Sequence, residues 1–285
     1  MLFRSTSEML LYGAYKTAYK SGGFNNSGLN SVFGSPSDFT FQPEKARGFE
    51  IGLKSTLLDQ QLRFNASAYT YGYEHQQIGF FNSVIFAFQT LNANVRVKGA
   101  EVEFEFAPRH IKGLNLHSAM NYNHARYTDF PNAPCYAGQT QGEGCNVIVG
   151  AAIRQNLAGK PLALAPDWTG VLGADYSRAI GDGLKAGISA DTRYSGAYLG
   201  SVFGIADSKQ DPYFTFDAGL RFGSQDDRWE TAILGKNLTN KFYITGVFDA
   251  PSTGTASGRA TGVHADQIGL ANLPRTVQLQ FTAKY

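Results

Sequence analysis

The sequence predicts an all-β protein whose strands form the wall of an antiparallel transmembrane β-barrel. Three observations support this: apolar and polar side chains alternate along many stretches, the connections alternate between long and short, and charges are few. Only 17% of the 285 residues are charged, against about 25% in soluble domains. No run of about 18 apolar residues is present, so the sequence contains no transmembrane helix. A barrel evades that test, because half of its side chains face a polar lumen.

The clearest alternation lies at the end of the chain. Val277, Leu279 and Phe281 fall on one face of a strand, while Gln278 and Gln280 fall on the other. The pattern runs for about 9 to 10 residues, which is what a tilted strand needs to cross a bilayer. An aromatic final residue suits a strand that ends at the membrane interface.

The same alternation predicts about ten strands, with no helix between them. In chain order they cover 9–20, 49–57, 62–73, 78–89 with a turn at Asn82-Ser83, 100–106, 114–122, 167–178, 184–198, 214–222, 229–238 and 273–285. Tyr69, Tyr71 and Tyr73 occupy the opposite parity from the preceding apolar residues, which indicates a bulge or an aromatic rim. Three carboxylates, at 101, 103 and 105, share one face, so we expect that face to be wet and paired with neighbouring basic side chains.

The connections between these strands alternate in length. Long connections lie near 21–42, 129–164, 199–211 and 239–273, and short ones near 58–61, 108–113, 179–183 and 223–228. Transmembrane barrels have short periplasmic turns and longer outside loops, whereas a soluble β-sheet binding protein has no reason to sort its loops. The connection near Asn82 falls on the long side but is short. This sorting places the C-terminus on the periplasmic side.

Few residues suggest chemistry. In an oxidising compartment Cys135 and Cys145 would pair and close a small loop; free thiols or metal ligands are the alternatives. The five histidines are scattered, and neither a nucleophile elbow nor a phosphate-binding glycine motif occurs. We therefore predict no catalytic residue, metal or cofactor. A net charge of +2 gives no footprint for nucleic acid.

Five motifs carry a resemblance to a known family. They are YKTAYKSGGFN at 15–25, FQPEKARGFEIGLK at 41–54, LNANVRVKGAEVEFE at 91–105, ILGKNLTNKF at 233–242 and the closing LPRTVQLQFTAKY. In this order and over nearly the whole chain, they resemble the C-terminal half of the barrel of TonB-dependent outer-membrane receptors. The resemblance implies that 1–285 supply about ten strands of a 22-strand barrel in the outer-membrane lipid, with the N-terminal plug absent.

The resemblance also implies a function, which is transport and not catalysis. Such receptors take up iron–siderophore complexes, cobalamin or similar scarce solutes, using energy from a TonB-type coupling protein that acts on the full-length receptor. The YKSGGFN motif is more similar to that of iron–siderophore receptors than to that of cobalamin receptors. No secretory signal opens the sequence, so we expect a truncated or partial product that is not competent alone. The alternative is a self-contained small outer-membrane barrel with hydrolytic activity. Its only loose candidates are Asp129, Asp211 and His264.

Two sets of residues are predicted to contact partners. The loop aromatics Tyr136, Tyr198 and Phe248 are candidate ligand contacts. The last strand presents an edge that the barrel assembly machinery would recognise by strand addition. The resemblance implies the same role, and Phe281 and Tyr285 are the residues expected to carry it.

Overall fold

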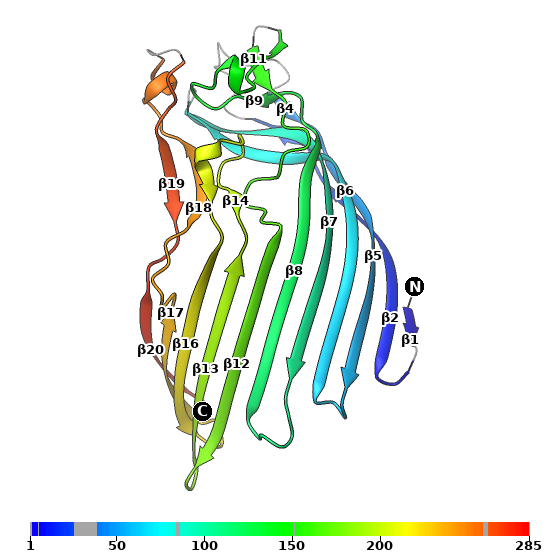
Figure 1. The fold of residues 1–285 in the computed structure, drawn as a ribbon, viewed down its shortest axis with the longest axis vertical. Helices are drawn as coiled ribbons and strands as arrows, with labels where there is room; N and C mark the ends of the chain where they lie inside the picture. Colours follow the sequence, from blue (N-terminus) through cyan, green and yellow to red (C-terminus); the bar gives the residue numbers. More distant parts are fainter. Residues whose placement is uncertain are drawn as a thin grey trace.

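The computed structural model describes residues 2–4, 6–25, 39–83, 86–150, 152–258 and 262–284. They form one curved antiparallel sheet of 11 strands, in the order β1-β2-β5-β6-β7-β8-β12-β13-β16-β17-β20 (Figure 1). The strands are β1 (Leu2–Arg4), β2 (Met9–Lys20), β5 (Glu44–Leu57), β6 (Leu62–Asn82), β7 (Ala87–Phe106), β8 (Leu114–Asp129), β12 (Trp168–Ile180), β13 (Leu184–Ser195), β16 (Tyr213–Ser224), β17 (Trp229–Lys236) and β20 (Thr276–Ala283).

The prediction of an antiparallel wall is confirmed, because the long strands pair in the order in which they occur along the chain. The stretches predicted as 62–73, 78–89 and 100–106 instead form only two strands, β6 and β7. The four short turns lie where the sequence placed them, within one or two residues, at 58–61, 107–113, 181–183 and 225–228. They gather at one end of the sheet, and the longer connections gather at the other (Figure 1). Among the described strands no pairing joins β1 to β20, so the sheet is open, and no plug domain is present within the described residues.

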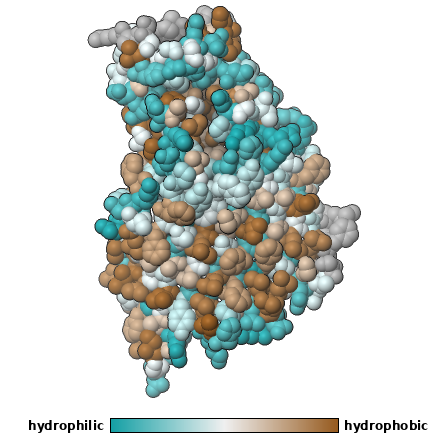
Figure 2. Space-filling view, in the orientation of Figure 1, coloured by the Kyte–Doolittle hydropathy of each residue, from teal (hydrophilic) through white to brown (hydrophobic). Residues whose placement is uncertain are grey.

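The outer face of the sheet is apolar and uncovered. Phe214, Phe216, Phe222 and Phe281 are 60%, 39%, 44% and 68% exposed, and within the described residues no helix or second sheet packs over them. Figure 2 shows the resulting band of apolar side chains across the strands, with hydrophilic residues above and below it. A water-soluble protein would bury such a surface, whereas in a bilayer it contacts acyl chains.

The inner face is polar and crossed by ion pairs. Lys16 Nζ lies 2.6 Å from a Glu50 carboxylate oxygen, and Arg63 lies 2.9 Å from Glu105. His117 Nε2 lies 2.9 Å from Asp191 Oδ1. The pairing of Glu105 with Arg63 matches the expectation that these carboxylates face water and basic neighbours rather than forming a catalytic cluster.

The tyrosines of β6 need no bulge at their own positions, which corrects the sequence prediction. The pairing of β6 with β7 is regular from Leu62 to Tyr73, so Tyr69 and Tyr71 continue the inner face of Arg63. The Tyr71 hydroxyl donates to Glu50 at 2.7 Å. A tyrosine reads as apolar in a sequence pattern, but its hydroxyl lets it serve the polar side of the wall.

Two register shifts occur higher, where β6 and β7 leave the wall. One lies between Tyr73 and Gln76 in the pairing of β6 with β7, and the other between Asn94 and Val95 in the pairing of β7 with β8. His75 has a φ of +54°, and its backbone N–H donates to the Asn94 side chain at 2.9 Å. Beyond this bend the hairpin runs across the end of the sheet toward the loops that precede β20 (Figure 1). The connection at its tip is short because the strands themselves supply the length.

Smaller elements build a cap on the long-loop end. They are β3 (Gly23–Phe24) with β4 (Thr40–Phe41), β9 (Ala133–Pro134) with β10 (Val147–Val149) and β11 (Ala152–Gln155), β14 (Tyr198–Leu199) with β15 (Lys209–Gln210), β18 (Ile244–Asp249) with β19 (Gln267–Ala271), and the 3-10 turns η3 (Gln141–Glu143), η4 (Ala206–Ser208) and η5 (Gly254–Ser257). No helix in the described part of the chain is long and apolar enough to cross a membrane.

Candidate functional site

Among the described residues, the largest buried apolar cluster lies at the cap end and not across the membrane span. It unites the top of the β6–β7 hairpin, the end of β8 and the following loop, through Ile78, Val95, Tyr127, Phe130 and Leu157. A second cluster packs Phe80 edge-on against Phe203, with ring centroids 5.3 Å apart. Because these side chains are sequestered from water by protein, the loops form a packed platform with a defined shape.

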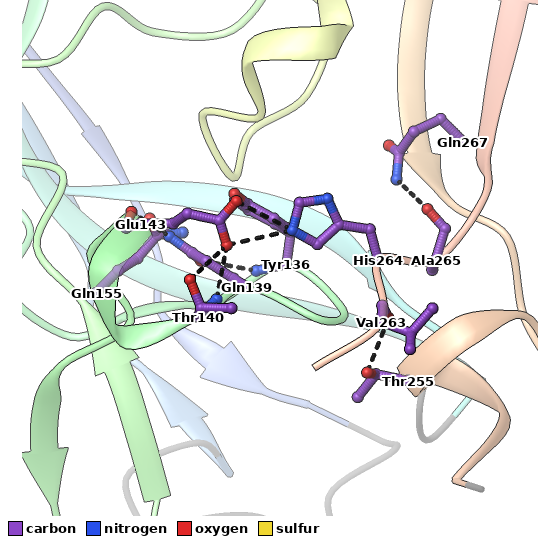
Figure 3. Close-up of polar contacts among 10 residues, drawn as sticks. All are labelled: Tyr136, Gln139, Thr140, Glu143, Gln155, Thr255, Val263, His264, Ala265 and Gln267. Atoms are coloured by element: carbon purple, nitrogen blue, oxygen red, sulfur yellow. Dashed lines mark hydrogen bonds and ion pairs between the residues drawn. The ribbon is translucent and has the colours of Figure 1, made fainter. Parts of the chain in front are cut away.

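Two loops far apart in the sequence are joined through backbone and side chains. The Ala137 backbone N–H donates to Asp249 Oδ2 at 2.7 Å, and the Ala265 N–H donates to the Ala137 carbonyl at 3.0 Å. Next to these bonds, His264 Nε2 lies 3.1 Å from Glu143 Oε1, and the Tyr136 ring packs edge-on against the His264 ring (Figure 3). The 130–164 loop is thereby fixed to the segment that precedes β19.

Glu143 is held as a carboxylate by its own turn. The backbone N–H and the hydroxyl of Thr140 both donate to Glu143 Oε2 at 2.8 Å (Figure 3). These bonds, together with the contact to His264, lower the pKa of Glu143 to about 2. The lowered pKa means that Glu143 stays charged over the whole physiological range.

A disulfide closes the segment that carries Glu143. Cys135 and Cys145 are bonded to each other, with their Cα atoms 5.7 Å apart, and the ring encloses η3. The bond fixes the ends of a glycine-rich segment whose freedom would otherwise oppose docking against His264.

The three aromatics predicted as ligand contacts lie in different parts of the cap. Tyr136 is half-buried against His264 and the second apolar cluster, and burial raises its pKa. The Tyr198 hydroxyl donates to the Ile244 carbonyl, and burial raises the pKa of Tyr198. Phe248 packs against Phe81, with ring centroids 5.7 Å apart. No described contact joins any two of these three predicted residues.

Sequence reasoning missed the partners of Phe248. Phe81, Phe86 and Phe88 come from the tip of the β6–β7 hairpin, and Phe81 packs against each of the other two and against Phe248. Phe86 and Phe88 are 72% and 78% exposed. We call these four residues the phenylalanine cluster. Its signal in the sequence was the dense run of phenylalanines at 80–88, which the alternation pattern predicted only as strand and turn.

The described residues assemble no catalytic or metal centre. They contain no group of three or more histidine, cysteine or acidic side chains with the spacing of a metal site. Asp129, Asp211 and His264, the loose candidates for hydrolysis, are not joined by any described contact; His264 instead pairs with Glu143, and Asp211 with Lys209.

The fold is that of a known family. A family profile described as "TonB dependent receptor-like, beta-barrel" matches residues 2–240, which is most of the chain. The chain belongs to the TonB-dependent receptors.

Solved structures agree with this assignment. The ferric yersiniabactin uptake receptor FyuA from Yersinia pestis has a TM-score of 0.67 and 15% identity, over 98% of this chain and 35% of that one. The siderophore receptor PiuA from Acinetobacter baumannii has a TM-score of 0.65 and 19% identity, over 100% and 35%. The ferric citrate transporter FecA has a TM-score of 0.62 and 14% identity, over 100% of this chain and 37% of that one. At these identities the likeness shows the fold, and the chain spans about a third of each receptor's length.

Family membership establishes three of the sequence predictions. The chain is part of a β-barrel of the outer membrane, its family are receptors and transporters, and it is not an enzyme. The alternative of a hydrolytic barrel is therefore wrong.

Proposed function

We propose that this chain forms part of the ligand-capturing mouth of a receptor for energised uptake of an iron–siderophore complex. The solved receptors that share its fold are named for ferric yersiniabactin, ferric catecholates and ferric preacinetobactin, among others. Their overlap with this chain covers the strands and the cap alike. In the full-length receptor, energy would come from a TonB-type coupling protein.

The observation that carries the proposal is the phenylalanine cluster. Two segments separated by about 160 residues converge there, and they leave two aromatic rings open at the outer end of the barrel wall. Aromatic rings offer a large contact area at low conformational cost to the apolar and conjugated parts of a chelate. The packed cap beneath fixes their positions, so capture requires little ordering of the loops.

Two further roles belong to the same proposal. The 285 residues would not transport alone, because each unpaired backbone group on the open edges of β1 and β20 costs several kcal/mol in lipid. Phe281 lies on the outer face of β20 and serves as part of the assembly signal; Tyr285, the second residue of that signal, lies outside the described residues. The 1–285 segment then acts as the C-terminal part of a larger barrel domain.

The test is uptake by cells in which the gene of the full receptor has been deleted and replaced. Growth on single iron sources and transport of ⁵⁵Fe-loaded siderophores identify the ligand. The double variant Phe86→Ala/Phe88→Ala should weaken binding of that ligand by roughly tenfold, whereas Ile148→Ala, another exposed apolar residue of the cap, should not. If deletion of the receptor gene left the uptake of every ferric siderophore unchanged, the proposal would be contradicted.

A further inference from the structure

The segment closed by the disulfide lies directly against the loop that precedes β19. We call residues 135–145 the disulfide ring. Its Ala137 carbonyl accepts the Ala265 N–H at 3.0 Å. Gly138 has a φ of +91°, and a Cβ at that position would lie 2.3 Å from the Val263 carbonyl oxygen. Glycine allows this backbone conformation and this close approach, so the contact depends on the backbone path of the ring.

A buried carboxylate joins the disulfide ring to β18. Asp249 is only 4% exposed. Its Oδ2 accepts the Ala137 N–H and its Oδ1 accepts the Gln267 side-chain amide, each at 2.7 Å. A buried carboxylate is stable while hydrogen bonds replace its hydration. If the ring moved away, Oδ2 would lose its donor, and the carboxylate would be drawn toward water.

Asp249 directly follows Phe248, the member of the phenylalanine cluster that β18 contributes. Successive side chains of a strand point to opposite faces, so Asp249 meets the disulfide ring while Phe248 meets Phe81, with ring centroids 5.7 Å apart. Phe81 in turn packs against Phe86 and Phe88. Direct contacts therefore lead from the disulfide ring, through one buried carboxylate, to the exposed aromatic rings.

We propose that the Cys135–Cys145 disulfide is a redox switch for the ligand-capturing mouth, and that Asp249 is the positioning residue through which it acts on Phe248. With the bond formed, the ring presents the Ala137 N–H to Asp249, and the phenylalanine cluster keeps its shape. With the bond reduced, the ring gains conformational freedom, Asp249 loses a donor, and β18 shifts with it. This regulation rests on the proposed function, in which the cluster contacts the ligand.

The reductant is a low-molecular-weight thiol outside the cell. Its thiolate attacks Sγ of Cys135, the more exposed of the two, which forms a mixed disulfide and releases Cys145 as a thiolate. A second thiolate attacks the reductant's own sulfur in the mixed disulfide and frees Cys135. Two thiol molecules are thereby oxidised to one disulfide, and their two protons pass to Cys135 and Cys145.

The experiment uses the full receptor that carries this chain, in lipid nanodiscs, and measures amide hydrogen exchange with and without dithiothreitol. The readouts are the amides of Val247 and Ala250, which donate to the carbonyls of Gly200 and Asp266, all outside the disulfide ring. Reduction should speed their exchange by roughly 5- to 50-fold. Loosening confined to the ring would leave these amides unchanged. The amides of β12 and β13 should not respond.

Two variants test the path of the effect. Cys135→Ser/Cys145→Ser should show the fast exchange without reductant, and dithiothreitol should add nothing. Asp249→Asn should behave in the same way, because its Nδ2 is a donor and cannot accept the second of the two hydrogen bonds. Folding of each variant is checked by heat-dependent migration on gels, and reduction of the unaltered receptor tests the switch even if a variant does not fold.

The matched control breaks another buried polar junction of the cap. Asn25 is 7% exposed and joins its loop to the β6–β7 hairpin through two hydrogen bonds to the Thr90 backbone, at 2.8 and 2.9 Å. Asn25→Ala should respond to dithiothreitol as fully as the unaltered receptor does.

Ligand capture provides a second readout. The probe is the ⁵⁵Fe-loaded siderophore that the growth test selects. Cells with Cys135→Ser/Cys145→Ser should take it up with a half-saturation concentration raised roughly three- to tenfold and an unchanged maximal rate. A merely destabilised receptor would instead be less abundant, which lowers the maximal rate.

Three outcomes would overturn the switch. They are unchanged exchange at Val247 in a receptor whose two free thiols are shown by labelling, an equal effect of dithiothreitol on Cys135→Ser/Cys145→Ser, and a full response to reductant in a folded Asp249→Asn receptor. If no ferric siderophore were taken up by the receptor, the proposed function would fail, whereas the exchange measurements would still decide whether the switch exists.

Discussion

The wall and the cap of this receptor segment place the same residue types on opposite sides. On the wall, Phe214 and Leu172 point outward and are more than half exposed, while ion pairs such as Lys16 with Glu50 lie on the inner face. In the cap, Phe203 and Ile205 are buried in a cluster with Phe80. The solvent accounts for the difference, since lipid accepts an apolar surface that water rejects. An apolar side chain is therefore evidence of a core only when the solvent on its side is known.

The two regions also differ in what holds them together. The wall is held by continuous ladders, such as the twelve paired residues of β12 with β13. The cap has short pairings and depends on apolar packing, one disulfide and side-chain bonds to backbone such as Asp249 to Ala137. Ladders tolerate the loss of one side chain better than a small packed core does.

The largest expected effect follows from removing a phenylalanine ring from each region and comparing the losses of stability. Phe203→Ala should cost the local stability of the cap about 3–5 kcal/mol, because it leaves a cavity beside Phe80. Phe214→Ala should cost much less, because acyl chains fill the vacated space. Hydrogen exchange of cap amides, together with urea unfolding in vesicles, measures both. Equal costs would mean that the cap has no core of its own.

Placing an arginine on the outer or on the inner face of the wall should give the next largest difference in stability. Leu172→Arg puts a cation in lipid and should destabilise the wall by about 2–4 kcal/mol near the bilayer midplane. Ala119→Arg, on the neighbouring strand but facing inward opposite Glu103, should change stability little. Urea unfolding in phospholipid vesicles compares the two. A similar loss from Ala119→Arg would show that the inner face is not wet.

The smallest effect concerns pH and is confined to the cap. The pKa of Glu143 falls from 4.5 to about 2, so its bonds to Thr140 and His264 stabilise the loop fully above the unfolded pKa. That contribution is lost as the pH falls through the folded value near 2. The protection factors of the 139–145 amides, which compare their exchange with the intrinsic rate at each pH, should therefore fall between about pH 4.5 and 2. Glu143→Gln should remove this step, and Asp211→Asn, in another loop, should leave it intact.

Local patterns predicted most of the wall, because a period of two residues is a property of the strand itself. The patterns were less informative for a side chain that has both an apolar ring and a polar group. The sequence placed Tyr71 with the apolar residues, yet its hydroxyl bonds Glu50 on the polar face. The stretches 62–73 and 78–82 were predicted apart but form one strand, because the irregularity at His75 bends the strand without ending it.

By itself, the sequence determined that the wall is a series of antiparallel strands, where its short turns lie and which face of each strand is apolar, since alternation and loop length act over a few residues. Only the tertiary structure decided that the β6–β7 hairpin reaches Phe248, that Glu143 meets His264 and that Arg47 and Arg96 flank Gly72 on one surface. Those contacts join residues 20 to 170 positions apart on the chain, roughly the span of several strands. No repeating pattern specifies them; they follow from the register of the sheet and the packing of the cap.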